Sequence, residues 1–434
     1  MAKSLGTWSA IVLIIALFWA GLTESAPADP QTVNGKTRLM LWTFVEQHGQ
    51  FYQEMAKRWN QRHPDRQIAL EVENVPDLHN KLQLSLYTGV AAPDIADIEV
   101  NSFPNFLRGE PQLIPLNDLV EPVKSQFVES RFDIYSKEGT YYGLPFHVGA
   151  TVMYYNREIL EQAGVDADEI DTWDDFIEAG KRVKKATGKW MITIDTSEQW
   201  TYHPLVIQRG SDFLDEHGNV MLDDPIQQQT LQFLYDLIYK HQIARPAPGG
   251  NHHAEEYYGF MNKGGAAAVQ MPLWYMTRFT DYMPDLKGKV VVRPMPVMKE
   301  GDAKSVGMGG TGTVITNQAE NPKLAKDFLR YAKLSREGNL EIWKQLGFDP
   351  VRSQIWDDPE FQVSNQYTEY FGRDLYQTLN SVKDDIRSPR FGPLTPRINT
   401  AINTQLLFNV LREKSQGPKE ALHQVADEMR GLNR

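Results

Sequence analysis

The 434-residue sequence contains no cysteine, and this absence removes several classes of chemistry at once. Without cysteine the chain has no disulfide bonds, no thiolate zinc sites, no iron–sulfur clusters and no cysteine nucleophile. It also lacks the lipid-modified cysteine that tethers many exported bacterial proteins to a membrane. The folded chain must therefore hold together through the packing of its core.

Basic residues are in the minority, with 45 Lys and Arg against 56 Asp and Glu and a net charge of −11. Binding to nucleic-acid phosphates requires a surplus of Lys and Arg, so we expect no nucleic-acid partner. The sequence also lacks a Gly-x-Ser-x-Gly nucleophile elbow. Nucleophilic catalysis therefore has no positive signal in the sequence.

The first 28 residues have the composition of an export signal. Lys3 precedes an apolar run over residues 8–22, which is followed by a polar stretch that ends in Ala26-Pro27-Ala28. The run of about 15 residues is shorter than the ~20 that a membrane-spanning helix needs. We expect cleavage after Ala28, with an uncleaved membrane anchor as the alternative, and an exported protein that works on the outer side of the cytoplasmic membrane.

The next 70 residues alternate between strand-like and helix-like patterns. Strands are predicted at residues 38–44, 68–72 and 93–100, and helices at residues 51–59 and 78–86. Such alternation is typical of a parallel sheet with right-handed crossovers.

A second series of elements begins after residue 147. Strands are predicted at 148–155, 191–194, 264–271, 290–292 and 312–315, and helices at 157–163, 173–187, 226–239 and 321–332. Asp171 and Thr172 are candidate caps of the helix at 173–187. Residues 244–251 are predicted to form a loop from their Pro and Gly content. The whole pattern predicts two α/β lobes, and ligands of such sheets bind at the carboxyl ends of the strands.

Asp97 and Glu99 form the best carboxylate pair, because alternate residues of a strand point to the same face. A glycosidase pair is conceivable. However, the sequence marks no second carboxylate on a separate element. Contact with a polar ligand and a purely structural role are the alternatives.

Two other motifs suggest metal or phosphate binding at first sight. His252 and His253 are adjacent, and do not have the i, i+4 spacing that zinc binding on one helix face needs, so we expect a loop with solvated histidines and no metal site. Residues 307–312 are rich in glycine but lack the Lys-Ser/Thr ending of a phosphate loop. Tight turns or a close approach of the backbone to a ligand explain them better, and no cofactor is expected.

Aromatic residues lie next to predicted strand ends and loops instead of on regular helix stripes: Trp42, Phe44, Trp200, Tyr202, Trp274 and Tyr275. Core packing is one interpretation of each ring. As a group, they suit stacking on the flat apolar face of a ligand, with neighbouring Glu, Gln, Asp and Asn side chains bonding its hydroxyls. A sugar presents both kinds of surface.

Several motifs in this order resemble a known family: Leu41-Trp42-Thr43-Phe44, Pro93-Asp94-Ile95, Tyr142-Gly143-Leu144-Pro145-Phe146, Tyr154-Tyr155-Asn156, Thr172-Trp173-Asp174-Asp175-Phe176, Gly264-Gly265-Ala266-Ala267, Gly309-Gly310-Thr311-Gly312 and Leu346-Gly347-Phe348-Asp349-Pro350-Val351-Arg352. The chain resembles the extracellular solute-binding proteins of family 1, the sugar-capturing subunits of ATP-driven importers. The resemblance covers essentially the whole chain after the signal segment.

This resemblance implies the type II periplasmic-binding-protein fold, in which two discontinuous α/β lobes are joined by a hinge and hold the ligand in a cleft between them. We place the N-terminal lobe at residues 31–147 plus 299–334 and the C-terminal lobe at 148–298 plus 335–434. The chain would cross between the lobes near residues 147–150, 297–301 and 334–338. The resemblance also implies that the protein has no catalytic residues and is not an enzyme. It further implies a monomer that delivers its ligand to the membrane permease subunits of an ABC importer.

Residues 246–261 and 281–289 are similar to those of family members that bind arabinose oligomers, so an arabino-oligosaccharide is the expected ligand. Another oligosaccharide or a glycerol phosphodiester is the alternative within binding proteins. A phosphate ligand would need several Lys or Arg residues in the cleft, and only Arg352 is well placed. The alternative outside binding proteins is a polysaccharide-acting glycoside hydrolase that uses Asp97 and Glu99.

The family's ligand-binding positions carry over to fourteen residues of this chain. They are Trp42, Phe44, Glu46, Gln47 and His48 after the first strand, Glu99 and Asn101, His147 at the first crossing, Trp200, Trp274 and Tyr275 from the other lobe, and Gly309, Gly310 and Arg352 at the border of the cleft. One departure concerns anchoring, because this chain has Pro, Ala and Asp where many relatives carry the lipid-anchored cysteine.

Overall fold

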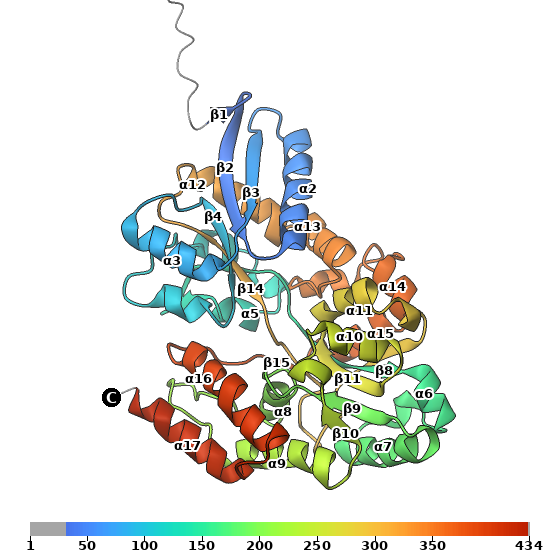
Figure 1. Ribbon diagram of the computed structural model, residues 1–434. Helices are drawn as coiled ribbons and strands as arrows, with labels where there is room; N and C mark the ends of the chain where they lie inside the picture. Colours follow the sequence, from blue (N-terminus) through green and yellow to red (C-terminus); the bar gives the residue numbers. More distant parts are fainter. Residues whose placement is uncertain (1–31, 433–434) are drawn as a thin grey trace, which may run out of the picture.

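The computed structural model describes residues 32–432, which form two large β-sheets covered by helices (Figure 1) and two further sheets of two strands each. The predicted signal segment, residues 1–28, lies outside the described residues. No helix within residues 32–432 has both the length and the apolar character needed to cross a membrane.

The first sheet combines strands from distant parts of the sequence. Its strands are β1 (Thr32–Val33), β2 (Lys36–Thr43), β3 (Ile68–Asn74), β4 (Ile95–Glu99), β7 (Leu144–Pro145) and β14 (Thr311–Ile315). The order is β3, β2, β4, β14, β7, with the short β1 also paired to β2. The strands β2, β3 and β4 are parallel, whereas β14 runs antiparallel to both β4 and β7.

Both faces of this sheet are buried, as the short apolar run at residues 38–44 predicts. Leu39 and Leu41 of β2 pack in the same core cluster as Phe51 and Met55 of α2 (Glu46–Arg62). On the opposite face, Trp42 packs with the leucine stripe of α3 (Leu78–Thr88).

The second sheet lies below the first in Figure 1 and has the order β10, β9, β11, β8, β12. Its strands are β8 (Thr151–Asn156), β9 (Trp190–Ile194), β10 (Ala244–Pro246), β11 (Ala266–Pro272) and β12 (Val290–Arg293). The helices α6 (Arg157–Gln162), α7 (Trp173–Thr187) and α9 (Pro225–Tyr239) connect these strands. The predicted helix at 173–187 has the bounds of α7, and the one at 226–239 differs from α9 by one residue.

The segment 244–251 differs from its prediction as a loop, because residues 244–246 form β10 and pair in parallel with β9. A proline cannot donate to a sheet ladder, and therefore Pro and Gly content favours a loop. The strand β10 lies at the edge of the sheet, where Pro246 is tolerated.

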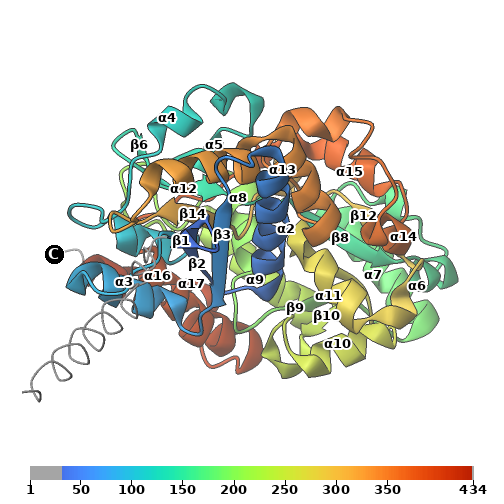
Figure 2. The same ribbon diagram turned by 90° about the horizontal axis from the view of Figure 1, so that it is seen from above.

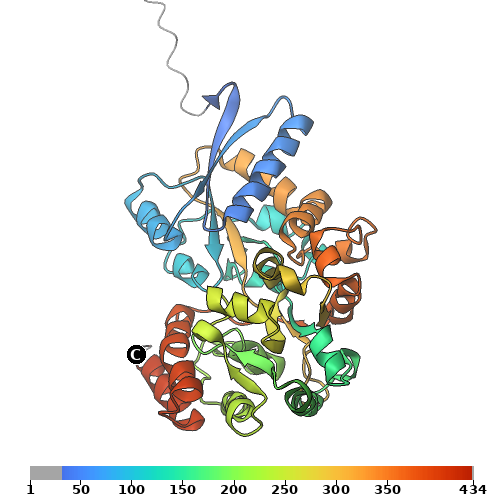
Figure 3. The same cartoon turned by 45° about the vertical axis from the view of Figure 1, so that its right-hand side comes forward.

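The chain returns to the first sheet through β14 and continues as α12 (Pro322–Leu329), the π-helical segment η7 (Arg330–Leu334), α13 (Arg336–Glu341) and the π-helical segment η8 (Ile342–Leu346). The segments η7 and η8 contact α2 of the first sheet, and Figures 2 and 3 show the orange helices beside the blue α2. The chain then reaches the second sheet, where α14 (Gln366–Phe371) and α15 (Leu375–Val382) contact β12.

The remaining elements are short segments and the C-terminal helices. They are η1 (Phe103–Leu107), α4 (Asn117–Val120), η2 (Lys124–Gln126), α5 (Ser130–Asp133), β5 (Ser136–Lys137), β6 (Thr140–Tyr141), η3 (Ala167–Glu169), α8 (Tyr202–Gln208), η4 (Pro248–Gly250), α10 (Glu255–Asn262), η5 (Leu273–Tyr275), α11 (Met276–Tyr282), η6 (Pro284–Leu286), β13 (Ser305–Val306), η9 (Ser353–Asp357), β15 (Ile386–Arg387), α16 (Thr395–Ala401), η10 (Ile402–Leu406), η11 (Phe408–Arg412) and α17 (Pro418–Gly431).

A capping box begins α7, as the sequence predicts from Thr172. The Asp175 backbone N–H donates to Thr172 Oγ1 (3.1 Å), and the Thr172 backbone N–H donates to Asp175 Oδ2 (3.0 Å). We expect Thr172→Ala to lower the free energy of unfolding by about 1 kcal/mol, because the Asp175 backbone N–H loses its acceptor, Thr172 Oγ1. Urea unfolding followed by circular dichroism measures the change. The control is Thr400→Ala within α16, where the exposed Thr400 hydroxyl only bonds back to Pro396 O; an equal loss in both variants would contradict the prediction.

Candidate functional site

A cavity of about 380 Å³ lies between residues of the two sheets. It is lined by Phe44, Val45, Gln47, His48, Gln50, Glu99, His147, Trp200, Trp274, Thr277, Arg278, Asp281, Gly309, Gly310, Thr311, Gln345, Leu346, Phe348, Gln366 and Tyr367. The carboxyl ends of β2 and β4 and the start of β14 reach it, which is where ligands of such sheets bind.

Nine of the fourteen predicted site residues line this cavity: Phe44, Gln47, His48, Glu99, His147, Trp200, Trp274, Gly309 and Gly310. The other five, Trp42, Glu46, Asn101, Tyr275 and Arg352, do not line it. Direct contact of any of the fourteen with a ligand stays a prediction.

The residues outside the cavity have partners elsewhere. Trp42 is 3% exposed in the core, with the Lys81 ammonium 4.3 Å from the centre of its ring. Tyr275 is fully buried, and its hydroxyl donates to the backbone carbonyl of His252. Arg352 Nη1 donates to Leu334 O (2.8 Å), away from the cavity. Burial and hydrogen bonding of this kind depend on the tertiary structure, so motif positions alone do not predict them.

A larger cavity of about 530 Å³ also touches both halves of the molecule, through residues 104–137, 214–218 and 388–393. None of the predicted site residues lines it. Its lining mixes Arg and Lys with Asp and Glu, and Phe391 is the one aromatic residue among the residues that line it, so it offers a sugar less surface for stacking than the smaller cavity does.

Two tryptophans form an aromatic corner of the smaller cavity. The rings of Trp200 and Trp274 have centroids 5.1 Å apart and planes inclined by 74°. Trp200 Nε1 donates to Glu198 Oε2 (2.6 Å), and Trp274 Nε1 donates to Met308 O (3.1 Å). Because the protein itself satisfies both indole N–H groups, the ring faces are what these residues offer to a ligand.

His147 brings unsatisfied polar atoms to the same cavity. The residue is 5% exposed, and neither ring nitrogen has a hydrogen-bond partner among residues 32–432. Burial, together with the charges of Arg131 and His48, lowers the pKa of His147 well below its usual value, so the ring is neutral. A neutral imidazole has one donor and one acceptor, and both suit a hydroxyl group.

Glu99 is bonded on both carboxylate oxygens by Asn101. The Asn101 backbone N–H donates to Glu99 Oε2 (2.8 Å), and Asn101 Nδ2 donates to Oε1 (2.7 Å). Asn101 Oδ1 in turn accepts from Asn399 Nδ2 of α16 (2.7 Å). Burial raises the pKa of Glu99 to about 7, although the bonds from Asn101 act in the opposite direction.

Asp97 has a structural role, so the glycoside hydrolase alternative is wrong. Its side chain is fully buried and accepts hydrogen bonds from Thr43 Oγ1 (3.0 Å), Tyr52 OH (2.9 Å) and Thr313 Oγ1 (2.8 Å), with His48 Nδ1 3.3 Å away. A glycosidase pair needs two carboxyl groups that flank the same glycosidic bond. Asp97 cannot reach a substrate because the core surrounds it.

Backbone conformation requires glycine at positions 309 and 310. Gly309 has φ 71°, and a Cβ there would lie 2.9 Å from Trp274 Nε1. Gly310 has φ 140°, and a Cβ there would lie 2.7 Å from Arg131 Nη2. Because glycine has no Cβ, the loop before β14 can pass close to Trp274 and to the buried Arg131.

Several residues that line the cavity were not predicted. Thr277, Arg278 and Asp281 follow Trp274 at i+3, i+4 and i+7, so they lie on one helix face. That spacing could have identified them once Trp274 was chosen. Gln345 and Gln366 carry no such signal, because single glutamines in helices are usually solvated surface residues.

The paired histidines differ from the prediction of solvated side chains. His252 is fully buried, with Nε2 3.1 Å from Thr193 Oγ1, and its backbone N–H donates to Asp195 Oδ2 (3.2 Å). His253 stacks on Trp274 at a centroid distance of 5.8 Å. The sequence around them predicts a surface loop, whereas the partners of His252 lie far away in the sequence, at Thr193 of β9 and at Asp195 directly after it. Within the described residues, no group of three or more His, Asp or Glu side chains is placed to hold a metal ion.

The raised pKa of Glu99 predicts a pH dependence of stability. The folded state binds the Glu99 proton more tightly than the unfolded chain, whose carboxyl has the ordinary value of 4.5. Glu99 therefore favours folding at acidic pH, and this contribution is lost as the pH rises towards and beyond 7. Glutamine does not titrate, so Glu99→Gln lacks this loss. We expect the free energy of unfolding of the variant, minus that of the wild type, to increase by about 2 kcal/mol from pH 5 to pH 8.

Urea unfolding at a series of pH values measures this difference. Glu46→Gln is the control, because the Glu46 carboxylate lies in the first turn of α2 and is exposed. The prediction would be refuted if the difference in free energy of unfolding between Glu99→Gln and the wild type did not change with pH.

Comparison with known proteins agrees with the two-lobed architecture. Residues 45–337 match the family described as bacterial extracellular solute-binding protein. An arabinooligosaccharide-binding protein of Halalkalibacterium halodurans is 50% identical over 397 residues, which cover 91% of this chain and 89% of that protein. An arabinooligosaccharide-binding protein of Bacillus subtilis is 43% identical over 437 residues, which cover 99% of this chain and 100% of that protein.

The sugar-binding protein MalE from Xanthomonas citri has a similar structure, with a TM-score of 0.76 at 18% sequence identity, over 91% of this chain and 96% of that one. The predicted fold of two α/β lobes of the type II periplasmic-binding-protein class is confirmed. The family consists of binding proteins that act outside the cytoplasm, which confirms the predictions that this protein is exported and is not an enzyme. The chain belongs to the family of bacterial extracellular solute-binding proteins.

Proposed function

We propose that this protein is the substrate-binding component of an ABC sugar importer, which captures an arabino-oligosaccharide in the cavity between its lobes. The observation that carries the proposal is the aromatic corner of Trp200 and Trp274, beside hydroxyl-bonding groups on the opposite lobe. The two relatives named for arabino-oligosaccharides, at 50% and 43% identity, support the choice of sugar.

The cavity suits an uncharged, hydroxyl-rich ligand. The faces of Trp200 and Trp274 stack on the sugar rings, while Gln47, Glu99 and His147 bond the hydroxyls. Among the described residues that line the cavity, Arg278 is the only arginine or lysine, and it shares the cavity with Asp281 and Glu99. This balance argues against a glycerol phosphodiester, because phosphate recognition favours several cationic groups.

We assign the lobes to the predicted segments, except that we place the third crossing later in the chain. Val148 N–H donates to Asp349 O (3.0 Å), and the Asp349 carboxylate accepts from the backbone N–H groups of Gly149 (3.0 Å) and Ala150 (2.7 Å). These bonds support a crossing at residues 348–351, beside the first crossing. The predicted crossing at 334–338 is earlier in the chain, and the contact of η8 with α2 favours assigning residues 335–346 to the N-terminal lobe.

Closure of the two lobes on the sugar is the signal to the importer. A ligand that touches both lobes binds the closed form better, and it shifts the population by its difference in affinity for the two forms. The membrane permease subunits then receive the ligand from the closed, monomeric protein.

Isothermal titration calorimetry with arabinotriose tests the proposal. We expect Trp274→Ala to weaken binding by about 10- to 100-fold, because stacking on an indole face is lost. Trp274→Phe retains an aromatic face but loses the bond to Met308 O, and it should bind with an intermediate affinity. The matched control is Trp190→Phe on β9, which does not line the cavity and should bind like the wild type.

The proposal would be refuted if the wild-type protein released no heat with arabinotriose or with any other oligosaccharide at millimolar concentration. Tighter binding of a glycerol phosphodiester than of any saccharide would also refute it.

A further inference from the structure

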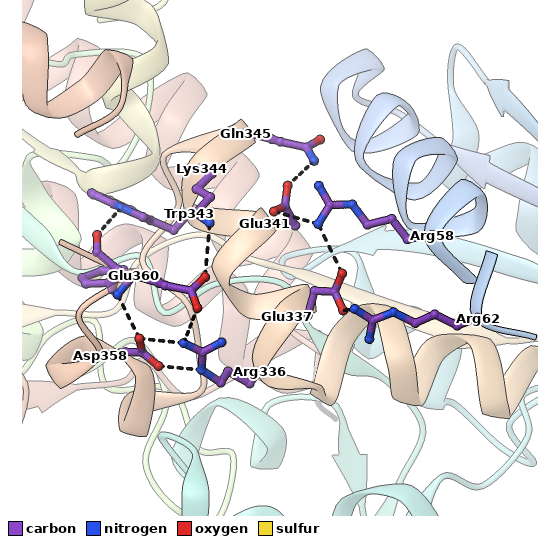
Figure 4. Close-up of polar contacts among 11 residues, drawn as sticks. Arg58, Arg62, Arg336, Glu337, Glu341, Trp343, Lys344, Gln345, Asp358 and Glu360 are labelled. Atoms are coloured by element: carbon purple, nitrogen blue, oxygen red, sulfur yellow. Dashed lines mark hydrogen bonds and ion pairs between the residues drawn. The ribbon is translucent and has the colours of Figure 1, made fainter. Parts of the chain in front are cut away.

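The side chain of Gln345 lines the cavity, and its amide group is held in one orientation. It lies on η8 and lines the cavity, and its Nε2 donates to Glu341 Oε2 (2.8 Å), as Figure 4 shows. A carboxylate oxygen only accepts hydrogen bonds, so the NH₂ end of the amide must face Glu341. The carbonyl oxygen, Oε1, accepts no hydrogen bond from residues 32–432. The free acceptor of Gln345 is therefore left for a ligand.

Glu341 is itself held in place from the other side. Its Oε1 accepts from Arg58 Nη1 of α2 (3.0 Å), and the residue is only 7% exposed. Arg58 is fixed in turn by Glu54, whose Oε1 accepts from Arg58 Nε (2.8 Å). Burial lowers the pKa of Arg58, but the bonds and charges of these carboxylates outweigh it and raise the pKa, so the guanidinium stays charged. Such charge-assisted bonds are stronger than bonds between neutral groups.

We propose that Gln345 is a specificity-determining ligand contact, whose carbonyl oxygen accepts a hydrogen bond from a hydroxyl group of the bound saccharide. Glu341, held by Arg58, is the positioning residue that keeps the amide in this orientation. The inference rests on the proposed capture of a saccharide by this cavity.

The fixed orientation gives the contact its selectivity. A free glutamine can turn its amide and present either a donor or an acceptor. With one N–H of Nε2 bound to Glu341, Gln345 cannot exchange the places of its nitrogen and its oxygen. Oε1 therefore stays an acceptor, which a hydroxyl group satisfies and which a ring oxygen, a glycosidic oxygen or an ionised phosphate does not.

Calorimetric titration of the exported protein with arabinotriose tests both parts of this inference. We expect Gln345→Ala to weaken binding about five- to tenfold, the usual effect of losing one hydrogen bond. Glu341→Gln should weaken binding about threefold or more when Gln345 is present, because the amide is no longer held in one orientation. In the Gln345→Ala background the same Glu341→Gln change should have less than a twofold effect, because no amide remains to be positioned.

Arg336→Gln is the matched control. Arg336 also follows η7 and pairs with Asp358 (Nε–Oδ2 2.6 Å) and Glu360 (Nη2–Oε1 2.9 Å), but it has no bond to Gln345 or Glu341 (Figure 4). Its replacement removes a comparable ion pair from the same region and should leave the Kd within twofold of the wild type. Thermal unfolding of every variant checks that it is folded.

If Glu341→Gln does not fold, Glu341→Asp replaces it in the cycle. This change keeps the negative charge near Arg58 and withdraws the carboxylate from Gln345 by one methylene group, so the same pattern of affinities is expected.

Three results would overturn the inference. If the wild type binds arabinotriose and Gln345→Ala binds it equally well, Gln345 is not a ligand contact. If Glu341→Gln weakens binding equally in both backgrounds, Glu341 does not act through Gln345. If the wild-type protein binds no saccharide, the proposed function is refuted, and the proposed contact of Gln345 is refuted together with it. This result differs from the other two because it is seen with the wild type alone.

Discussion

The buried carboxylate of Asp97 is the constraint on which the first lobe depends. It accepts hydrogen bonds from Thr43 at the end of β2, Tyr52 of α2 and Thr313 of β14, and so joins segments that are more than 200 residues apart in the sequence. Burial by itself would raise the pKa of Asp97, but the hydrogen bond and charge of His48 outweigh it and lower the pKa. A carboxylate bonded in this way is costly to leave without its partners, so it holds β14 beside β4.

This constraint also shapes the wall of the cavity and the segments packed beside it. His48 contacts Asp97 on one side and lines the cavity on the other, with its ring stacked on Phe146 at 4.3 Å. The Lys333 ammonium lies 3.0 Å from the centre of the Phe146 ring and has no hydrogen-bond partner among the described residues. The same buried cluster therefore connects the wall of the cavity with η7 and with Phe146.

Much of the fold could be predicted from periodicity, because an element that buries one face repeats its apolar residues at the period of that element. The leucines of α3 and the cap at Thr172 are examples. Three features could not be predicted in this way. The strand β10 forms because β9 offers an edge for pairing. His252 is buried beside its partners Thr193 and Asp195. The segment η8 packs on α2, although it follows the residues at which the third crossing was predicted. Each depends on a partner distant in sequence.

The candidate site, like the fold, has features that the local sequence determines and features that depend on tertiary contacts. The sequence by itself determined the residue types that the chemistry needs, namely tryptophans at strand ends and loops and acceptors beside them, and it determined the absence of thiol chemistry through the lack of cysteine. Only the tertiary structure decided that Trp42 and Tyr275 belong to the core while Trp200 and Trp274 line the cavity, and that Gln345 lines it with its NH₂ group bonded to Glu341. The physical reason is that burial and the direction of a side chain follow from contacts between elements, which no local pattern of residues contains.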